Sequence, residues 1–442
     1  MISSKNIPEY FLFFENVLRK RLNHFLQEKN DKQLSSQEIQ FTYFDSIDDN
    51  FLDNDTVSIE ALIILLLTLA SHIKPNLIDS IIQEYFPQGG DFPEFGGVRG
   101  ANHRGLLPTG ETAQFILAGN DIAKRLEVQL LLMEGILVKE NILFLETVKE
   151  GEPLMSGRLI FSPEWISKIL LGKEIPPRFS PDFPAKLITT KMDWSDLVIN
   201  SRTAQQIQDI KVWLDNHKIL LNDWGMRKRI KPGYRALFYG PPGTGKTLTA
   251  SLLGKEFNKD VYRIDLSQVV SKYIGETEKN LEKIFQKAEN KDWILFFDEA
   301  DALFGKRSNV QSAHDKYANQ EVSYLLQRVE DFPGLIILAS NYKTNIDSAF
   351  VRRFNAIIHF PMPGHQERFE LWNSSKPVQA SFENEAELWN IAVKYELSGS
   401  AILSVIQYAS LQALNKSTTV LSKEALMEGI KREYEKEERV FS

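Results

Sequence analysis

The 442-residue sequence contains no cysteine, which excludes disulfides, thiolate metal sites and thiol nucleophiles. The same absence fits a reducing cytoplasm, where we expect the protein to reside. Long apolar runs are also missing. The longest, residues 61–70, has about half the length that a helix needs to cross a bilayer, so we expect a buried helix and no membrane span. We expect no signal peptide, because the basic residues near the N-terminus follow the apolar ones.

Positive charge is in short supply. The formal net charge is −7 and the pI is near 5.7, which is unfavourable for a protein that binds phosphate backbones. Hydrophobic residues make up 43% and charged residues 25%, as in ordinary globular proteins. One basic run, residues 227–231, reads as a solvated linker, with nucleic-acid binding as the alternative.

The N-terminal region, residues 1–185, alternates apolar helical stretches with loops. Two β-rich segments within residues 141–162 flank a polar Gly/Pro turn and predict a hairpin. Helices followed by a hairpin suggest a mainly helical region with a winged-helix-like part, which we interpret as a domain for a partner or substrate. The Pro-rich segment 172–186 reads as the linker that ends it.

The pattern changes in residues 186–362. Short buried runs such as "ALFYG", "ILFF", "LIILAS" and "AIIHF" alternate with helical stretches, which is typical of a parallel sheet with crossover helices. Residues 363–442 read as entirely helical. We found no internal repeat. The predicted fold class is therefore α/β, with helical regions on both sides of one sheet domain in the sequence.

A phosphate-binding loop is predicted between the run "ALFY" and the next helix. The segment "GPPGTGKT" fits G-x-x-x-x-G-K-[ST], in which glycines let backbone N–H groups surround phosphates. Lys246 would bind the β- and γ-phosphates and Thr247 would ligate Mg²⁺. The sequence thus predicts ATP as substrate and Mg²⁺ as cofactor, bound by Gly240, Pro241, Pro242, Gly243, Thr244, Gly245, Lys246, Thr247 and Leu248.

The run "ILFFDEAD" supplies the acidic half of the site. Four apolar residues predict a buried strand, and two acids follow at its carboxyl end, where open α/β sheets bind ligands. We expect Asp298 to hold Mg²⁺, directly or through water, and Glu299 to polarise the attacking water.

The letters "DEAD" also name a group of RNA helicases. Lys246 and Asp298 are 52 residues apart, room for one helix, one strand and another helix, whereas that helicase family places more chain there. Its S-A-T motif, its H-R-x-G-R-x-x-R motif and its second sheet domain have no counterpart here. The spelling is therefore incidental.

From residue 193 to residue 440 the chain resembles the AAA+ family, in the branch built on one AAA module. "MDWSDLVIN" is similar to the entry segment, which implies that Leu197 and Val198 lie against adenine. "LIILASN" ends at the sensor 1 position, which implies that Asn341 helps to hold water near the γ-phosphate. "IDSAFVRRF" matches the arginine fingers, so the resemblance implies that Arg352 and Arg353 reach a neighbouring subunit's ATP site in a ring, usually a hexamer.

The helical C-terminal region resembles the family's lid. "YELSGSAIL" is similar to the start of a lid helix, which implies that Gly399 and Ala401 pack near the nucleotide. Ser400 stands between them, and the sensor 2 arginine of other branches is missing.

The segment "SKYIGETEKN" indicates what kind of substrate the protein acts on. In the family, an aromatic residue in such a segment projects into the central pore and grips a polypeptide. The resemblance implies this role for Tyr273, between Lys272 and Ile274.

A narrower resemblance links "AHDKYAN", "HRGLLPTGETAQFILAG" and the C-terminal "ALMEGIKREYEKEER" to bacterial AAA ATPases encoded beside phage-tail-like contractile injection particles. It implies a role in assembling, loading or recycling such particles, with their components or cargo as protein clients. Two alternatives stay open: a motor or loader acting on DNA or RNA, and an ATP-controlled scaffold that switches assembly without threading.

Overall fold

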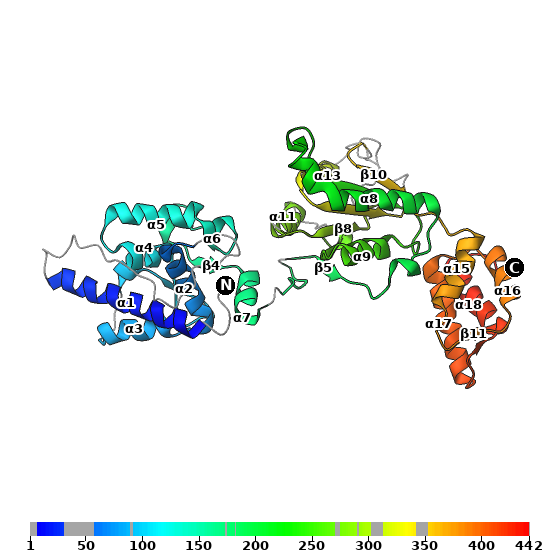
Figure 1. The fold of residues 1–442 in the computed structure, drawn as a ribbon, viewed down its shortest axis with the longest axis horizontal. Coiled ribbons are helices and arrows are strands. Elements are labelled where there is room, and N and C mark those ends of the chain that lie inside the picture. The colour runs from blue at the N-terminus through cyan, green and yellow to red at the C-terminus, as the bar shows by residue number, and fades with distance from the viewer. Residues whose placement is uncertain are drawn as a thin grey trace. The chain divides into compact units, whose positions relative to one another are not determined.

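The computed structural model describes residues 7–30, 57–88, 92–172, 175–181, 183–269, 275–289, 291–301, 313–341 and 352–441. The chain divides into two compact units, residues 1–177 and residues 178–442 (Figure 1). Buried apolar clusters lie within each unit, so each has its own hydrophobic core.

The first unit is mainly helical. Its helices are α1 (Ile7–Asn30), α2 (Ile59–Ile73), α3 (Leu77–Tyr85), α4 (Gly110–Ala118), α5 (Ile122–Glu134), α6 (Ile136–Lys139) and α7 (Pro163–Leu171). Helix α2 begins where the Ser58 hydroxyl accepts from the Ala61 N–H, and residues 61–70 are all buried. The predicted buried helix is thereby confirmed. Within the described ranges no single helix could cross a membrane by length and hydropathy, and α2 and α3 pass that test only as a pair bent by 104°.

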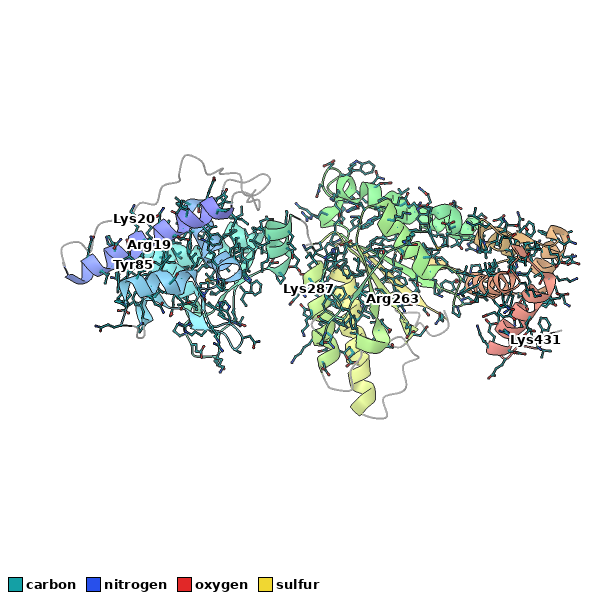
Figure 2. All side chains as sticks on the ribbon, turned by 90° about the horizontal axis from the view of Figure 1, so that it is seen from below. Arg19, Lys20, Tyr85, Arg263, Lys287 and Lys431 are labelled. Carbon is teal, nitrogen blue, oxygen red and sulfur yellow. The ribbon has the colours of Figure 1, made fainter. Side chains whose placement is uncertain are left out.

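Two short ribbons complete this unit. Strands β1 (Val98–Arg99) and β2 (Leu106–Leu107) pair antiparallel, as do β3 (Leu143–Leu145) and β4 (Leu159–Phe161). The second ribbon is the predicted hairpin. Helix α1 is tied to α3 by an ion pair between Arg19 and Glu84, and Figure 2 labels Arg19 with the neighbouring Tyr85. The winged-helix-like character of this region stays a prediction.

The second unit is built on a six-stranded sheet. Its order is β10 (Ala356–His359), β6 (Tyr234–Tyr239), β9 (Leu335–Ser340), β8 (Ile294–Asp298), β7 (Val261–Asp265) and β5 (Lys186–Ile188). Five strands are parallel, and β5 runs antiparallel on the edge beside β7. The sheet is therefore mixed, and the parallel sheet expected from the sequence accounts for all of it except this edge strand.

Both faces of the sheet are covered, which explains the continuous apolar runs. On β8, Phe296 packs in a cluster with side chains from α8 (Ser201–Leu221) and α9 (Lys246–Glu256). Its neighbour Phe297 packs in a second cluster with α11 (Glu276–Ala288) and α13 (Ala313–Asp331). Alternate residues of one strand thus enter two cores, as in buried parallel sheets.

The chain between Lys246 and Asp298 forms α9, β7, the short α10 (Leu266–Val269) and α11. This is the helix, strand and helix that the spacing predicts, with one additional helical turn. Because parallel strands need a crossover, this arrangement brings the ends of β6, β9 and β8 to the same edge of the sheet.

After the sheet the chain is almost entirely helical. Helices α15 (His365–Ser375), α16 (Glu385–Lys394), α17 (Gly399–Asn415) and α18 (Lys423–Lys436) enclose a core around the fully buried Trp372. The exception to the all-helical expectation is a two-residue parallel pair, β11 (Ser381–Phe382) with β12 (Val420–Leu421). The domain limits expected at residues 185 and 362 stay predictions.

Candidate functional site

The loop between β6 and α9 adopts a conformation that depends on glycine. Gly240, Gly243 and Gly245 have φ angles of +146°, +73° and +100°. A Cβ on Gly243 would lie 1.9 Å from the Ser400 Oγ. The loop therefore lies directly against the start of α17, and its backbone is the inner wall of the site.

Lys246 is the first residue of α9, and only 9% of it is exposed. Its Nζ donates to the carbonyl oxygens of Gly240 at 2.5 Å and Pro241 at 3.0 Å, and to Asn341 Oδ1 at 3.3 Å. Burial lowers the pKa of the Lys246 amine, and the nearby carboxylates of Asp298 and Asp301 act in the opposite direction. The ammonium is thus held by weak neutral acceptors that anionic phosphate oxygens can replace.

The acidic cluster follows β8, as its sequence predicts. Asp298 Oδ1 accepts from the Glu299 N–H at 3.0 Å, and its Oδ2 pairs with Arg263 Nη2 on β7 at 2.9 Å. Figure 2 labels Arg263. Glu299 has φ +53°, a left-handed conformation that is uncommon for a non-glycine residue. Strain of this kind persists at functional sites where the surroundings enforce it.

Asn341 follows the last residue of β9, beside β8 in the sheet. Its backbone N–H donates to Asp301 Oδ2 at 2.9 Å, and its side chain accepts from Lys246. Asn341 therefore stands between the phosphate-binding loop and the acidic cluster, where a polar group near the γ-phosphate is expected.

One cavity of about 740 Å³ joins these groups. The predicted residues that line it are Leu197, Val198, Pro242, Gly243, Thr244, Gly245, Lys246, Thr247, Leu248, Asp298, Glu299, Asn341 and Gly399. Gly240, Pro241 and Ala401 do not line it, although the carbonyls of Gly240 and Pro241 bind Lys246. Nearly all of the predicted nucleotide site thus lies around a single cavity.

Arg352 and Arg353 do not line this cavity. Both are exposed, and Arg353 Nη1 pairs with Glu330 Oε1 at 2.8 Å. The three predicted pore residues, Lys272, Tyr273 and Ile274, lie outside the described residues. The structure therefore brings together the predicted nucleotide and metal residues, and leaves the two arginines apart from them.

The cavity fits a nucleoside triphosphate with a magnesium ion. Its phosphate end has glycine backbone, an ammonium and the N-terminus of α9, a favourable place for anions. Thr247 and Asp298 supply the oxygen ligands that Mg²⁺ prefers, and Mg²⁺ takes few protein ligands when phosphates supply others. The described residues contain no group of three or more His, Cys, Asp or Glu side chains able to hold a metal alone.

Three of the residues that sequence reasoning missed make polar contacts in the site. Arg263 contacts Asp298 from the neighbouring strand, and Asp301 binds the backbone of Asn341. Ser400 lines the cavity, where its N–H donates to the Gly243 carbonyl at 3.3 Å. Of these three, Asp301 alone carried a signal, because it stands three residues after Asp298 in the same acidic run.

Comparison with known proteins identifies this domain. Residues 236–362 match the family described as "ATPase family associated with various cellular activities (AAA)". Similar proteins include a 26S proteasome regulatory subunit 6B homolog of Aspergillus niger, 32% identical over 42% of this chain and 46% of that protein. The proteasome-activating nucleotidase of Aeropyrum pernix is 31% identical over 46% of this chain and 51% of its own length.

Vacuolar protein sorting-associated protein 4B of Mus musculus is 34% identical over 41% of this chain and 42% of that protein. The chain spans about half the length of the relatives it matches. The matched residues include Lys246, Asp298, Glu299 and Asn341. The chain therefore contains an ATPase domain of the AAA family.

Proposed function

We propose that this protein is a ring-forming ATPase that couples ATP hydrolysis to remodelling, unfolding or threading of a protein client. One observation carries the proposal. Lys246, Asp298, Glu299 and Asn341 come from three separate segments of the chain and line the same cavity. This is the set of groups that phosphoryl transfer to water requires: a cation, a metal ligand, a base and a polar positioning group.

The chemistry follows from these positions. Lys246 binds the β- and γ-phosphate oxygens. Thr247 and Asp298 would hold Mg²⁺, which would supply positive charge to the phosphates. Glu299 orients a water molecule and accepts its proton as the water oxygen bonds to the γ-phosphorus. The bond from that phosphorus to the β–γ bridging oxygen breaks, so ADP and inorganic phosphate leave. Asn341 holds the water or the γ-phosphate in line.

Assembly into a ring, with six copies as is usual in the family that the chain resembles, is supported by the position of the two arginines. Arg352 and Arg353 are exposed and do not line the cavity of their own subunit. An arginine that stabilises the transferring phosphoryl group must reach it, so these residues would act on the cavity of a neighbouring copy. Gly399 and Ala401 start the helix that would close over the nucleotide as a lid.

A protein client is supported by charge and by the first unit. The chain is acidic overall, and three of its relatives are named for the proteasome or for protein sorting. Helix α5 exposes four apolar side chains on one face, at spacings of four, four and three residues: Ile122, Leu126, Leu130 and Met133. An apolar face suits protein contact, so we assign residues 1–185 to partner or client binding and Tyr273 to grip in the pore.

The client that we favour is a component or cargo of a contractile injection system, in the cytoplasm. Support for this comes from the sequence resemblance of the segments around residues 103–119 and 313–319. The absence of cysteine is consistent with the cytoplasm.

A motor acting on DNA or RNA is the second candidate. Arg227, Lys228 and Arg229 are exposed in a row, and Trp224 nearby is 75% exposed. Basic side chains beside an exposed aromatic ring are a combination that binds single-stranded nucleic acid. Lys231, by contrast, is engaged by Glu330 and Asp331.

The deciding experiment uses Glu299→Gln as a trap. We expect this variant to bind ATP with wild-type affinity and to hydrolyse it at least about a hundredfold more slowly, the usual loss for a general base. Glu140→Gln, an exposed substitution in the first unit, is the matched control and keeps the wild-type rate. Hydrolysis by Glu299→Gln at the wild-type rate contradicts the assignment of the base.

The trapped protein, tagged and loaded with ATP in its own cells, is then isolated and its bound molecules are identified. An enriched protein that is released on exchange to ADP supports the remodelling function and names the client. Nuclease-sensitive nucleic acid without an enriched protein supports the second candidate. An enriched structural protein of an injection particle supports the finer assignment.

A further inference from the structure

Asp301 binds two consecutive residues at the end of the neighbouring strand. Its Oδ2 accepts from the backbone N–H of Asn341 at 2.9 Å, and its Oδ1 accepts from the Ser340 hydroxyl at 2.5 Å. Both carboxylate oxygens are thus used on one short segment. Hydrogen bonds to an ionised carboxylate are among the stronger ones in proteins.

This pair of hydrogen bonds continues the sheet where its ladder stops. The β8–β9 pairing ends at Phe297 opposite Leu338. Beyond it, the chain turns at Glu299, and the Ala300 N–H donates to the Ala339 carbonyl at 2.9 Å. The carboxylate of Asp301 then holds Ser340, the last residue of β9, and Asn341 after it, at a point where β8 no longer pairs with β9.

The held segment touches the phosphate-binding loop at two points. The Ser340 carbonyl accepts from the Gly240 N–H at 3.2 Å, and the Asn341 side chain accepts from Lys246. Ser340 is 1% exposed, so its hydroxyl has no access to water as an alternative partner. A displacement of this segment therefore changes the position of Asn341 relative to Lys246.

We infer that Asp301 is a positioning residue for ATP hydrolysis, which fixes the Asn341 side chain against the phosphate-binding loop and the attacking water. The inference rests on the proposed function, since it assigns Asp301 a task in that reaction. Asp301 acts only through Asn341 and touches no reacting atom. A small misplacement of a group that positions the attacking water slows the reaction strongly. Loss of the Asp301 carboxylate therefore lowers the rate of the chemical step more than the affinity for ATP.

The test compares Asp301→Asn with wild type in kcat and in the dissociation constant for ATP. An amide at this position keeps one acceptor oxygen for the Asn341 N–H and presents an N–H₂ group to the Ser340 hydroxyl, which must turn round to accept it. The substitution therefore removes the carboxylate charge that strengthens both hydrogen bonds, at nearly constant volume. We expect kcat to fall by about tenfold to a hundredfold, with the ATP dissociation constant changed by less than about threefold. Asp292→Asn, which loses an ion pair with Lys259 just before β8, is the matched control and keeps its kcat.

A double-mutant cycle separates positioning from a general structural effect. If Asp301 acts through Asn341, the Asp301→Asn/Asn341→Ala protein is no slower than Asn341→Ala alone. Losses that multiply in the double variant overturn the inference, and so does a wild-type kcat for Asp301→Asn. Ser340→Ala removes one of the two donors and leaves Asp301 in place, so it supplies the same test if Asp301→Asn does not fold. A wild-type protein without ATPase activity would contradict the proposed function instead, which keeps the two failures distinct.

Discussion

The guanidinium of Arg353 lies 2.8 Å from the carboxylate of Glu330 in the same subunit, while its neighbour Arg352 is exposed. Glu330 also binds Lys231, and Arg235 donates to its backbone carbonyl. Arg353 is thus held in a small charged network, and it does not line the cavity of its own chain.

This arrangement predicts complementation between subunits. Arg352→Ala and Arg353→Ala should each lower ATPase activity by about a thousandfold, the usual contribution of an arginine finger, without loss of ATP binding. Mixing either variant with Lys246→Ala should restore activity, because one protein then supplies the cavity and the other the arginine. Glu330→Gln controls for loss of the ion pair. Mixtures that stay inactive would contradict action between subunits.

Because Gly243 lies against Ser400, a methyl group added at Gly243 should lower both ATP affinity and thermal stability. Gly243→Ala combines a φ of +73° with a Cβ only 1.9 Å from the Ser400 Oγ, so ATP affinity and thermal stability should both fall. Gly151→Ala is the matched control: its φ is +93° and nothing lies within 4 Å, so it should cost only the backbone strain, about 1 kcal/mol. Adding Ser400→Gly to the Gly243→Ala protein should partly restore its ATP binding, because the clashing hydroxyl is then absent. Equal effects at the two glycines would show that the contact is unimportant.

Replacement of Tyr273 tests the proposed grip on the client. Tyr273→Ala should retain ATP hydrolysis without client and lose client processing, because the aromatic ring provides apolar contact to an extended chain. Tyr273→Phe keeps the ring and should keep processing. Remodelling of the trapped client, measured by its protease sensitivity with ATP, checks this. Full processing by Tyr273→Ala would remove the residue from the proposed pore.

The stability of the first unit should depend on pH through His72. Partial desolvation lowers the pKa of this imidazole, although His72 is exposed at the surface, and His103 nearby lowers it further. Below the ordinary value of about 6.5 the unfolded chain binds the proton more readily than the folded unit, so acid favours unfolding until the folded pKa is passed. His72→Gln removes this group. The melting temperature of the variant, measured relative to that of wild type, should therefore rise as pH falls from 7.5 to 5. A difference in melting temperature that does not change with pH would contradict a role for His72.

Much of the sheet and the nucleotide site could be predicted because the information is local. The segment containing Gly243, Lys246 and Thr247 defines its own loop and helix start, and the apolar run before Asp298 places that acid at a strand end. The spacing between Lys246 and Asp298 predicts the intervening strand. These features depend on neighbouring residues, whose patterns a single sequence displays.

What escaped prediction depends on register between distant segments. Asp301 and Asn341 are 40 residues apart, and they meet because Phe297 is paired with Leu338 in the ladder. Arg263 reaches Asp298 in the same way, through the pairing of β7 with β8. Antiparallel β5 was missed because three residues are too few to show a strand pattern.

The hydrogen bond from the Ser400 N–H to the Gly243 carbonyl fixes the first turn of helix α17 to the phosphate-binding loop, so a rotation there would be amplified at the other end of the helix. The helix has 17 residues, and at 1.5 Å per residue it is about 25 Å long. A rotation of about 10° at its first turn moves its far end, at Asn415, by about 4 Å over that length. A small rotation at the phosphate-binding loop would thus displace the far end of α17 by about the size of a side chain.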